Sequence, residues 1–463
     1  MMRSQRFTIS AQPLLKGPRR LSTGSLIVAA VVFCALDLQG YALAWTGEIT
    51  ANINSPGPTI PANFVGFSDE VSDVITDTIF TLGNASLIDL LKLLGPNGIW
   101  RIGGADSDLN PPPALTQQIA NDAVAFISAL GAGWSTIYGL DALIQDSTIA
   151  VTQAGYLLKA FPRGSIAFQV GNEPDFYFTH GINEAGWINI FNSYYSALTT
   201  TYSGLQFGGP DTAGLSNIGW VDGTILGRSG FAYITAHKYT LPCAPTSVTD
   251  DQVMADATVP SDAGVTLTEF GILCDGGQMG VTDRLIAATY YLKLAQSAFA
   301  AGMQGILPHN VLTPSLWGDG IHLAYYNQFV AQPDGGYAPA PMFYGMYLFA
   351  QLEGQTSIST IISSSLDNRA SVNATLGPNG NANILVVNVN TTHEIAVEPE
   401  QSQPWSTANV YVLSGKNCED PNPLLNGYAI GQGGTWPGSA AILVRSQHVS
   451  IPACGAALIE IQP

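Results

Sequence analysis

The sequence predicts a (β/α)8 barrel followed by a β-sandwich domain that also takes in the N-terminal strand. Two observations lead to this fold class. From about residue 63 to residue 354, strand-like and helix-like segments alternate, whereas after Gly354 only short β-type runs remain, separated by Gly, Pro, Asn and Ser. A doubly wound open sheet is the alternative for the first region, but no glycine-rich phosphate-binding loop opens a helix there.

Eight apolar runs are the expected barrel strands, and each is followed by a helix or a long loop. These strands are expected at residues 63–67, 99–103, 134–139, 165–170, 205–209, 232–237, 265–268 and 305–308. Between them, the apolar residues recur at helical spacing in the segments 86–94, 114–130, 148–161, 188–202, 284–301 and 342–352. The length of the region agrees with a barrel of ordinary size.

The second domain is predicted from five short β-type runs, at residues 384–388, 394–398, 409–413, 440–444 and 457–461. Residues 47–53 alternate like a strand before the barrel begins, so we expect this segment to pair into the sandwich. The predicted domains are therefore a signal peptide at 1–44, an N-terminal strand segment at 45–62, the catalytic barrel at 63–354 and the sandwich at 355–463.

The first 44 residues are typical of a secretory signal. A basic region from Arg3 to Arg20 precedes an apolar stretch of about eleven residues, and Ala42-Leu43-Ala44 offers a cleavage site after Ala44. An uncleaved anchor is the alternative, but the apolar stretch is well short of the ~20 residues that span a bilayer. We expect a protein that is secreted, or periplasmic in a Gram-negative source, without a stable membrane span.

Removal of residues 1–44 leaves 11 Lys and Arg, 33 Asp and Glu, and a formal charge of −22. Such an acidic surface argues against nucleic acid and polyanionic substrates. Four cysteines remain, Cys243, Cys274, Cys418 and Cys454, and an even number in an exported chain indicates two disulfides. Three pairings exist. We favour Cys243–Cys274 and Cys418–Cys454, because the strands before the first two cysteines should end on the same face.

Two glutamates follow buried strands directly. Glu173 ends the run 167–174, which finishes in Gly-Asn-Glu-Pro, and Glu269 ends the run 265–269. The C-terminal ends of barrel strands line the mouth where barrel enzymes carry out their chemistry. Cleavage of a glycosidic bond with retention needs two carboxyl groups about 5–5.5 Å apart. A single strand-end glutamate is usually a solvated residue or an ion-pair partner, but two of them at strands 4 and 7 favour catalysis.

The chain resembles glycoside hydrolase family 79, the β-glucuronidase and heparanase family within the large clan of barrel glycosidases. The resemblance rests on motifs that span almost the whole mature chain. They are the stretch 65–70 at the first strand, 101–104 with Asp108 at the second, 168–174 at the fourth, 237–239 at the sixth, and Glu269 with 276–277 at the seventh. Asn-Glu-Pro alone is specific for the clan, and the ordered set is moderately specific for the family.

The resemblance implies Glu173 as acid/base and Glu269 as nucleophile. It also implies that Asn172 binds the sugar 2-hydroxyl, that Tyr239 donates to the nucleophile, that Glu70 and Asp108 bind ring hydroxyls, and that the Gly276 amide meets a substrate carboxylate. Arg101 is expected to be structural, within a buried ion pair, and His237 to be a hydrogen-bonded scaffold residue. Many family members carry a tyrosine shortly after the nucleophile, where this chain has Cys274 and Asp275. Tyr325 or Tyr326 would supply the compensating hydroxyl.

These features predict a secreted, retaining exo-β-glycosidase, with β-glucuronidase as the leading activity. A β-glucosidase or another neutral-sugar exo-glycosidase on the same fold is the alternative, since an aspartate would repel a uronic acid. Heparanase-like endo-cleavage and a non-catalytic carbohydrate-binding protein are weaker alternatives. The expected partner is a carbohydrate substrate. No metal or organic cofactor is expected, because two carboxylates hydrolyse glycosides without one, and no oligomeric state is predicted.

Overall fold

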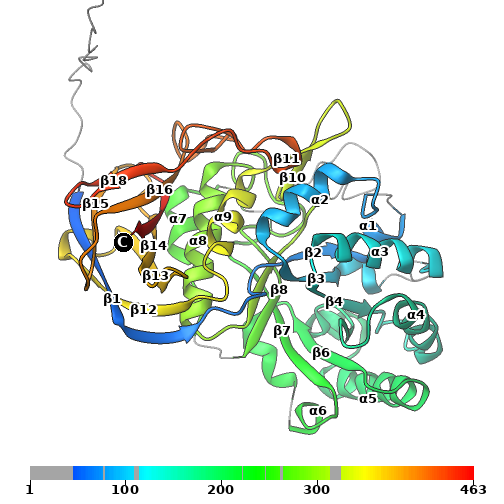
Figure 1. The fold of residues 1–463 in the computed structure, drawn as a ribbon. Helices are drawn as coiled ribbons and strands as arrows, with labels where there is room; N and C mark the ends of the chain where they lie inside the picture. The colour runs from blue at the N-terminus through cyan, green and yellow to red at the C-terminus, as the bar shows by residue number, and fades with distance from the viewer. Residues whose placement is uncertain are drawn as a thin grey trace, which may run out of the picture. The chain divides into compact units, whose positions relative to one another are not determined.

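The computed structural model describes residues 45–76, 79–108, 114–221, 223–243, 245, 247–260, 264–312 and 325–462. Its first part is a barrel of eight parallel strands, ordered as they occur in the chain, and its second part is a β-sheet domain (Figure 1). The predicted fold class is therefore confirmed. The predicted signal peptide, residues 1–44, lies outside the described residues. No helix in the described ranges combines the length and the apolar character that a bilayer crossing requires.

The barrel strands carry almost uninterrupted buried residues, as expected for parallel strands covered by helices on one side and filled with side chains on the other. They are β2 (Phe67–Glu70), β3 (Asn97–Gly103), β4 (Gly133–Leu140), β5 (Ile166–Val170), β6 (Gln206–Thr212), β7 (Phe231–Tyr239), β8 (Val265–Gly271) and β9 (Gly305–Pro308). The first and last strands meet through bridges from Val65 to Ile306 and from Ser68 to His309, which close the barrel.

The first barrel strand lies further along the chain than the sequence indicates. Apolar periodicity predicts residues 63–67, whereas β2 runs from Phe67 to Glu70. The polar residues Ser68 and Asp69 are fully buried there because each has partners. The Asp69 carboxylate accepts from the Trp100 indole at 2.8 Å and from the Val311 amide at 3.0 Å. A prediction based on hydrophobicity misses the end of this strand, because its buried residues are polar and are stabilised by hydrogen bonds.

Helices follow most barrel strands, and Figure 1 shows them around the outside of the sheet. The six predicted helices are present, with bounds shifted by a few residues at most, and three short helices, α1, α6 and α7, were not predicted. The α-helices are α1 (Val71–Thr76), α2 (Ala85–Leu91), α3 (Gln117–Leu130), α4 (Ser147–Ala160), α5 (Glu184–Thr201), α6 (Gly223–Leu226), α7 (Asp250–Asp256), α8 (Leu285–Ala300) and α9 (Pro341–Ala350). The 3-10 helices are η1 (Lys92–Leu94), η2 (Ala105–Asp108), η3 (Pro174–His180), η4 (Leu215–Trp220), η5 (Ser364–Leu366) and η6 (Gln432–Gly434).

The second domain is one ten-stranded sheet with the order β17-β16-β20-β14-β13-β12-β1-β15-β19, and β18 also pairs with β16. Strands from opposite ends of this order, β16 and β19, contact each other. The sheet therefore folds over itself around its own apolar core, as in a sandwich. Its strands are β1 (Trp45–Thr59), β12 (Thr356–Ile362), β13 (Ala370–Leu376), β14 (Ala382–Asn388), β15 (Ile395–Gln401), β16 (Thr407–Ser414), β17 (Leu424–Leu425), β18 (Ala441–Val444), β19 (Val449–Ile451) and β20 (Ala456–Gln462).

The N-terminal strand belongs to this sheet, as predicted. β1 pairs antiparallel with β12 and parallel with β15, so it fills the gap between two strands from the C-terminal part of the chain. The sandwich prediction missed the short strands β17 and β19 and the longer strands β12 and β13. In the two longer strands the alternation is blurred by Ser, Thr and Asn at half-buried positions. A separate two-stranded sheet, β10 (Phe329–Ala331) with β11 (Tyr337–Pro339), lies before α9.

The barrel and the β domain share one continuous apolar core. Helix α8 provides the contact, because nearly all of its residues are buried. The Gln296 side chain donates to the Leu385 carbonyl of β14 at 3.1 Å, and the Leu285 amide donates to the Asp420 carbonyl at 2.8 Å. The β domain therefore covers one side of the barrel and holds α8 in place.

Both favoured disulfide pairings are present. Cys243 is joined to Cys274, and Cys418 to Cys454. The second bridge links two buried cysteines of the β domain beside α8, where the Thr289 hydroxyl donates to the Cys454 carbonyl. This disulfide restrains the end of β16 relative to β20 and the helix.

We expect the double variant Cys418→Ala/Cys454→Ala to have a free energy of unfolding about 2–4 kcal/mol lower than the wild type, because the bridge restricts the unfolded chain. Urea denaturation of both proteins under oxidising conditions measures the difference. Equal denaturation midpoints and slopes would show that the bridge adds nothing to stability.

Candidate active site

Glu173 is positioned by a sharp change of backbone direction at the end of β5. Gly171 has a φ of 86°, and a side chain there would collide with the Tyr177 hydroxyl. Glu173 itself has a φ of 47°, a left-handed conformation that costs a non-glycine residue free energy and is typical of functional sites. Its amide donates to the Asp211 carbonyl at 2.9 Å, and Pro174 then begins η3. The chain thus holds this carboxylate at the strand tip by backbone contacts.

Glu269 comes from β8, the seventh barrel strand, and is almost completely buried. The Tyr239 hydroxyl donates to its Oε1 at 2.6 Å, and the Arg101 Nη1 donates to its Oε2 at 2.6 Å. Tyr239 ends the neighbouring strand β7, so its position follows from the barrel register. Both carboxylate oxygens are therefore oriented by charged or polar donors.

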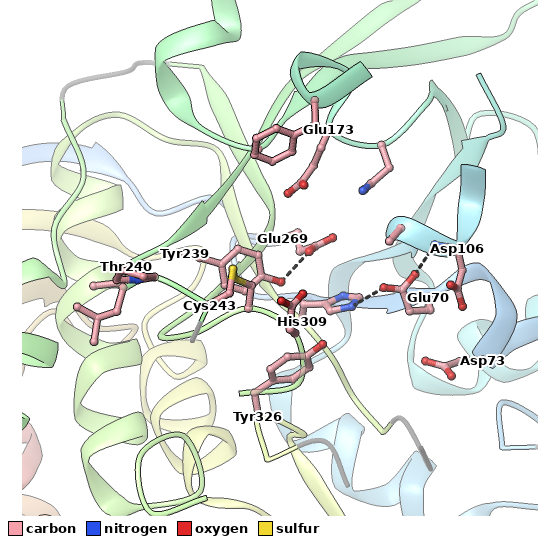
Figure 2. Close-up of a pocket in the computed structure, with 18 of the residues that line it drawn as sticks. Glu70, Asp73, Asp106, Glu173, Tyr239, Thr240, Cys243, Glu269, His309 and Tyr326 are labelled. Carbon is pink, nitrogen blue, oxygen red and sulfur yellow. Dashed lines mark hydrogen bonds and ion pairs between the residues drawn. A yellow bond between two sulfur atoms is a disulfide. The ribbon is translucent and has the colours of Figure 1, made fainter. Parts of the chain in front are cut away.

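The two glutamates face the same cavity. An oxygen of Glu173 lies within 4.8 Å of an oxygen of Glu269. The cavity has a volume of about 640 Å³, which is within the range of small-molecule sites. Figure 2 shows Glu173 and Glu269 projecting into it, with Tyr239 on one side of Glu269 and Glu70 on the other.

Arg101 connects most of the polar residues beneath the cavity. Its side chain is fully buried, and its nitrogens reach five partners on four strands or their ends. These partners are Ser68 at 3.2 Å, Gln169 at 3.4 Å, Asn172 at 2.7 Å, Asp211 at 2.6 Å and Glu269 at 2.6 Å. The predicted buried ion pair of Arg101 is therefore present, with two carboxylates.

Asp211 and His237 complete this charged network. His237 is buried, with Nδ1 at 2.9 Å from Glu173 Oε1 and Nε2 at 3.1 Å from Asp211 Oδ1. Burial opposes a charge on its ring, but Asp211 and Glu269 outweigh burial and raise the pKa of His237 to about 10. His237 is thus a cation that holds the Glu173 carboxyl, which agrees with the scaffold role expected from the sequence.

The same charges act on Glu269. Burial would raise the pKa of its carboxyl, but nearby positive charges lower that pKa overall. The charges belong to His309, His237 and Arg101, and the Tyr239 hydroxyl adds a hydrogen bond. Glu269 is therefore held as a carboxylate, whereas the Glu173 side chain keeps 23% of its surface exposed in the cavity. The two glutamates stand in different environments, as an acid and a nucleophile require.

An acidic group lies on the Glu70 side of the cavity. The Glu70 carboxylate accepts from the Asp106 amide at 2.9 Å and contacts His309 Nε2 at 3.1 Å. Asp73 and Asp106 line the cavity next to it (Figure 2). Burial alone would lower the pKa of His309, but the negative charges of Glu269 and Glu70 outweigh burial and raise this pKa to about 9. Polar atoms suited to sugar hydroxyls are therefore concentrated here.

Asn172 and Asp108, both predicted to bind sugar, differ in position. Asn172 lines the cavity, and its carbonyl oxygen accepts from Arg101, which leaves the amide group as the donor for a ligand. Asp108 does not line this cavity. Its carboxylate accepts from the amides of Ala142 and Asn172 at 2.9 and 3.0 Å and from the Tyr177 hydroxyl. Asp108 thus fixes the backbone of Asn172 from outside the cavity. Binding of a ring hydroxyl by Asp108 remains a prediction.

Three loop residues, Gly276, Tyr325 and Tyr326, were predicted to meet a substrate carboxylate, and they differ in whether they line the cavity. Tyr326 is buried in the cavity wall, and the Gly276 backbone hydrogen-bonds its hydroxyl. Gly276 itself does not line the cavity, and its carbonyl accepts from the Tyr325 amide at 2.7 Å. The Tyr325 side chain lines a second cavity with Phe329 and Tyr337. Of the two tyrosines proposed from the sequence, only Tyr326 reaches the glutamates' cavity.

Several site residues were not singled out in the sequence. Asp211 is the penultimate residue of β6, within a Gly-Pro-Asp sequence, and His309 follows β9 directly. Both stand at strand tips, so the rule that identified the glutamates could have identified them. Asp106 lies in η2, between Gly104 and Asp108 of the second-strand motif. Its position depends on the hydrogen bond to Glu70, which no spacing in the sequence reveals.

Three groups in the described part of the chain bring metal-ligand atoms together. Two of them contain the sulfur atoms of a disulfide, which are not free thiolates. The third is Glu173, His237 and Glu269. Metal binding requires a neutral imidazole nitrogen, and both nitrogens of the cationic His237 face carboxylates. These residues fit a proton-handling site better than a metal site.

Comparison with known proteins shows similarity in structure alone. No protein-family model matches the sequence, and no curated protein matches it. Similar solved structures include a 4-O-α-L-rhamnosyl-β-D-glucuronidase from Fusarium oxysporum, with a TM-score of 0.66 and 16% identity over 90% of this chain and 100% of that chain. They also include an arabinofuranosidase of glycoside hydrolase family 51 from Xanthomonas axonopodis pv. citri (0.63, 11%, 90% and 100%) and a monomeric β-xylosidase from Caulobacter crescentus (0.58, 12%, 90% and 99%). The chain therefore shares the barrel-plus-β-domain fold of these glycoside hydrolases.

The raised pKa of His309 predicts a pH-dependent contribution to stability. A histidine whose pKa rises from 6.5 to about 9 on folding stabilises the protein fully below pH 6.5, and this stabilisation is lost as the pH rises through 9. We expect His309→Gln to be less stable than the wild type at a pH of about 6, with a difference that shrinks towards a pH of about 10.

Urea denaturation across this pH range measures the difference. His448→Gln is the matched control, because His448 is 42% exposed on the β domain. A His309→Gln difference that stays constant with pH would contradict the assignment.

Proposed function

We propose that this protein is a retaining exo-β-glycosidase that uses Glu269 as nucleophile and Glu173 as acid/base. The observation that carries the proposal is the carboxylate pair at the tips of β5 and β8, with oxygens within 4.8 Å of each other in one cavity. Retaining glycosidases use carboxyl groups about 5–5.5 Å apart, whereas inverting enzymes separate them by about 6.5–9.5 Å. The short separation supports retention.

In the first step, the Glu269 carboxylate attacks the anomeric carbon while the Glu173 carboxylic acid protonates the glycosidic oxygen. The leaving group departs as an alcohol, and a glycosyl ester of Glu269 remains. In the second step, the Glu173 carboxylate takes a proton from water, the water oxygen bonds to the anomeric carbon, and Glu269 is released as a carboxylate. The Asn172 amide and Glu70 are the proposed partners of the sugar hydroxyls.

A β-glucuronide is the first candidate substrate. The Tyr326 hydroxyl lines the cavity and can donate to a uronic acid carboxylate, and the positive charge of the neighbouring His309 favours such an anion. The resemblance of the sequence motifs to the β-glucuronidase family supports the same sugar. The Fusarium oxysporum protein of similar fold is itself a rhamnosyl-glucuronidase.

A neutral sugar such as a β-glucoside is the second candidate, because acidic groups dominate the cavity. Asp73, Asp106 and Asp275 line it in addition to the two glutamates and Glu70, and no Lys or Arg is among the described lining residues. Carboxylates repel a uronic acid but accept hydrogen bonds from hydroxyls.

Initial rates on matched aryl β-glucuronide and aryl β-glucoside substrates separate the two candidates. Whichever sugar is cleaved, Glu269→Gln should remove nearly all turnover, because no carboxylate is left to attack the anomeric carbon. Glu173→Gln should lower kcat by about 10²–10⁴-fold on a substrate with a poor leaving group, and by less on an activated aryl glycoside. Proton NMR of the first-formed sugar should show the β-anomer.

Glu394→Gln serves as the control, because Glu394 is an exposed carboxylate of the β domain and does not line the cavity. It should leave turnover nearly unchanged. An α-anomer as the first product, or turnover that survives in Glu269→Gln, would overturn the mechanism. Turnover of the glucoside without turnover of the glucuronide would support the mechanism but change the proposed substrate from a β-glucuronide to a β-glucoside.

Tyr239→Phe tests how Glu269 is held. The change removes the hydroxyl that donates to Oε1 and helps to lower the pKa of this carboxylate. We expect kcat to fall about 10- to 100-fold, as for a lost hydrogen bond to a charged group, and the acid limb of the kcat/KM profile to move to higher pH. Tyr290→Phe is the control, because its hydroxyl donates to the Gly271 carbonyl. An acid limb that moves equally in both variants would refute the assignment.

A further inference from the structure

We propose that the leaving-group side of this cavity is an apolar subsite, built around Phe176, that takes an aromatic aglycone in preference to a second sugar. The inference rests on the proposed function, because it assigns the leaving group to the side of the acid/base Glu173. It adds the chemical class of the aglycone, which neither the carboxylate pair nor the glycone candidates specify.

Phe176 is an exposed aromatic residue fixed three positions after Glu173. Its side chain is 55% exposed, yet it lines the cavity. The helix η3 that carries it is held by its neighbours. The Asp175 carboxylate accepts from the Ala213 amide at 2.9 Å and from the Asn217 amide group at 2.8 Å, and Tyr177 is buried against Asp108. An aromatic ring that lines a cavity and is half exposed offers its free face to a ligand there.

A second group of apolar residues lines the same cavity. Leu241 and Pro242 follow β7, and the disulfide between Cys243 and Cys274 joins this segment to the loop after β8. The Leu241 amide donates to the Ile272 carbonyl at 2.9 Å, so the two loops are tied by backbone as well as by sulfur. The cavity therefore offers an apolar ligand a second surface besides the Phe176 ring.

Acidic groups are concentrated on one side of the cavity, and Asp275, next to the Cys243–Cys274 bridge, is a carboxylate outside that group. Glu70, Asp73 and Asp106 lie on one side of the two glutamates, and Thr240 and Cys243 lie on the other (Figure 2). Hydroxyl-rich rings suit the acidic side, where hydrogen-bond acceptors are concentrated. A second sugar would need comparable partners on the other side, whereas an aromatic ring needs the face of Phe176 and the second apolar surface.

Phe176→Ala is the test variant, and Phe178→Ala is the matched control. Phe178 belongs to the same 3-10 helix and is 66% exposed, but it does not line the cavity. The kcat/KM values are measured on the methyl and 2-naphthyl β-glycosides of whichever sugar the enzyme cleaves, and on the corresponding β-linked disaccharide. A substitution that weakens Glu173 slows the methyl glycoside more than the naphthyl glycoside and so raises the ratio of the naphthyl to the methyl value, whereas loss of the subsite lowers it.

We expect Phe176→Ala to lower this ratio about tenfold, as for the loss of a stacked aromatic contact with its buried area, and Phe178→Ala to leave it within about twofold. The wild type should favour the naphthyl glycoside over the disaccharide. An unchanged ratio in Phe176→Ala, or a disaccharide cleaved better than the naphthyl glycoside, would overturn the inference while Glu269-dependent turnover still supported the proposed function.

Titration calorimetry with free 2-naphthol tests the subsite without catalysis. The apolar subsite is supported if 2-naphthol binds the wild type and Phe178→Ala but binds Phe176→Ala more weakly. If the enzyme cleaves no glycoside and this binding pattern is still found, only the proposed function fails. Equal binding to all three proteins, or no binding to the wild type, overturns the inference.

Discussion

The buried guanidinium of Arg101 is the constraint on which the site depends. A fully buried cation is costly unless its donors are all engaged, and Arg101 engages Ser68, Gln169, Asn172, Asp211 and Glu269. These residues come from β2, β5, β6 and β8 or from their ends. The ion pair therefore draws the barrel together and, at the same time, orients the proposed nucleophile and the asparagine beside the proposed acid. Arg101 therefore serves both the stability of the barrel and the geometry of the proposed site.

The network also divides the work between the two glutamates. Glu269 lies among Arg101, His237 and the Tyr239 hydroxyl, and its pKa is lowered in spite of burial. Glu173 stands further out, held by its left-handed backbone and by one contact to the His237 ring. The proposed nucleophile is thus held ionised, whereas the proposed acid/base is open to the cavity, where a two-step displacement brings first the leaving group and then water. Beyond them, Glu70, Asp73 and Asp106 line one side of the cavity, and Phe176 lines it three residues after Glu173.

The sequence predicts the parts of this structure that depend on hydrophobic pattern. The strand tips at Glu173 and Glu269, the barrel and the pairing of the N-terminal strand with the β domain all follow from buried runs and their order. It misses features that depend on partners far away in the chain. Polar Ser68 and Asp69 obscure the end of β2, His309 meets Glu70 where the first and last barrel strands join, and the place of Asp106 depends on its hydrogen bond to Glu70. The position of Tyr326 in the cavity, without Tyr325, likewise depends on how one loop is folded.

The central claim, a covalent glycosyl intermediate on Glu269, is tested most directly by trapping it. Incubation with an activated 2-deoxy-2-fluoro β-glycoside of the cleaved sugar slows the second step more than the first, so the ester accumulates. Mass spectrometry of the intact protein and of its peptides should then show one fluoroglycosyl group per chain, attached to Glu269. Rapid turnover of the parent glycoside with no label, or a label on another residue, would contradict the account.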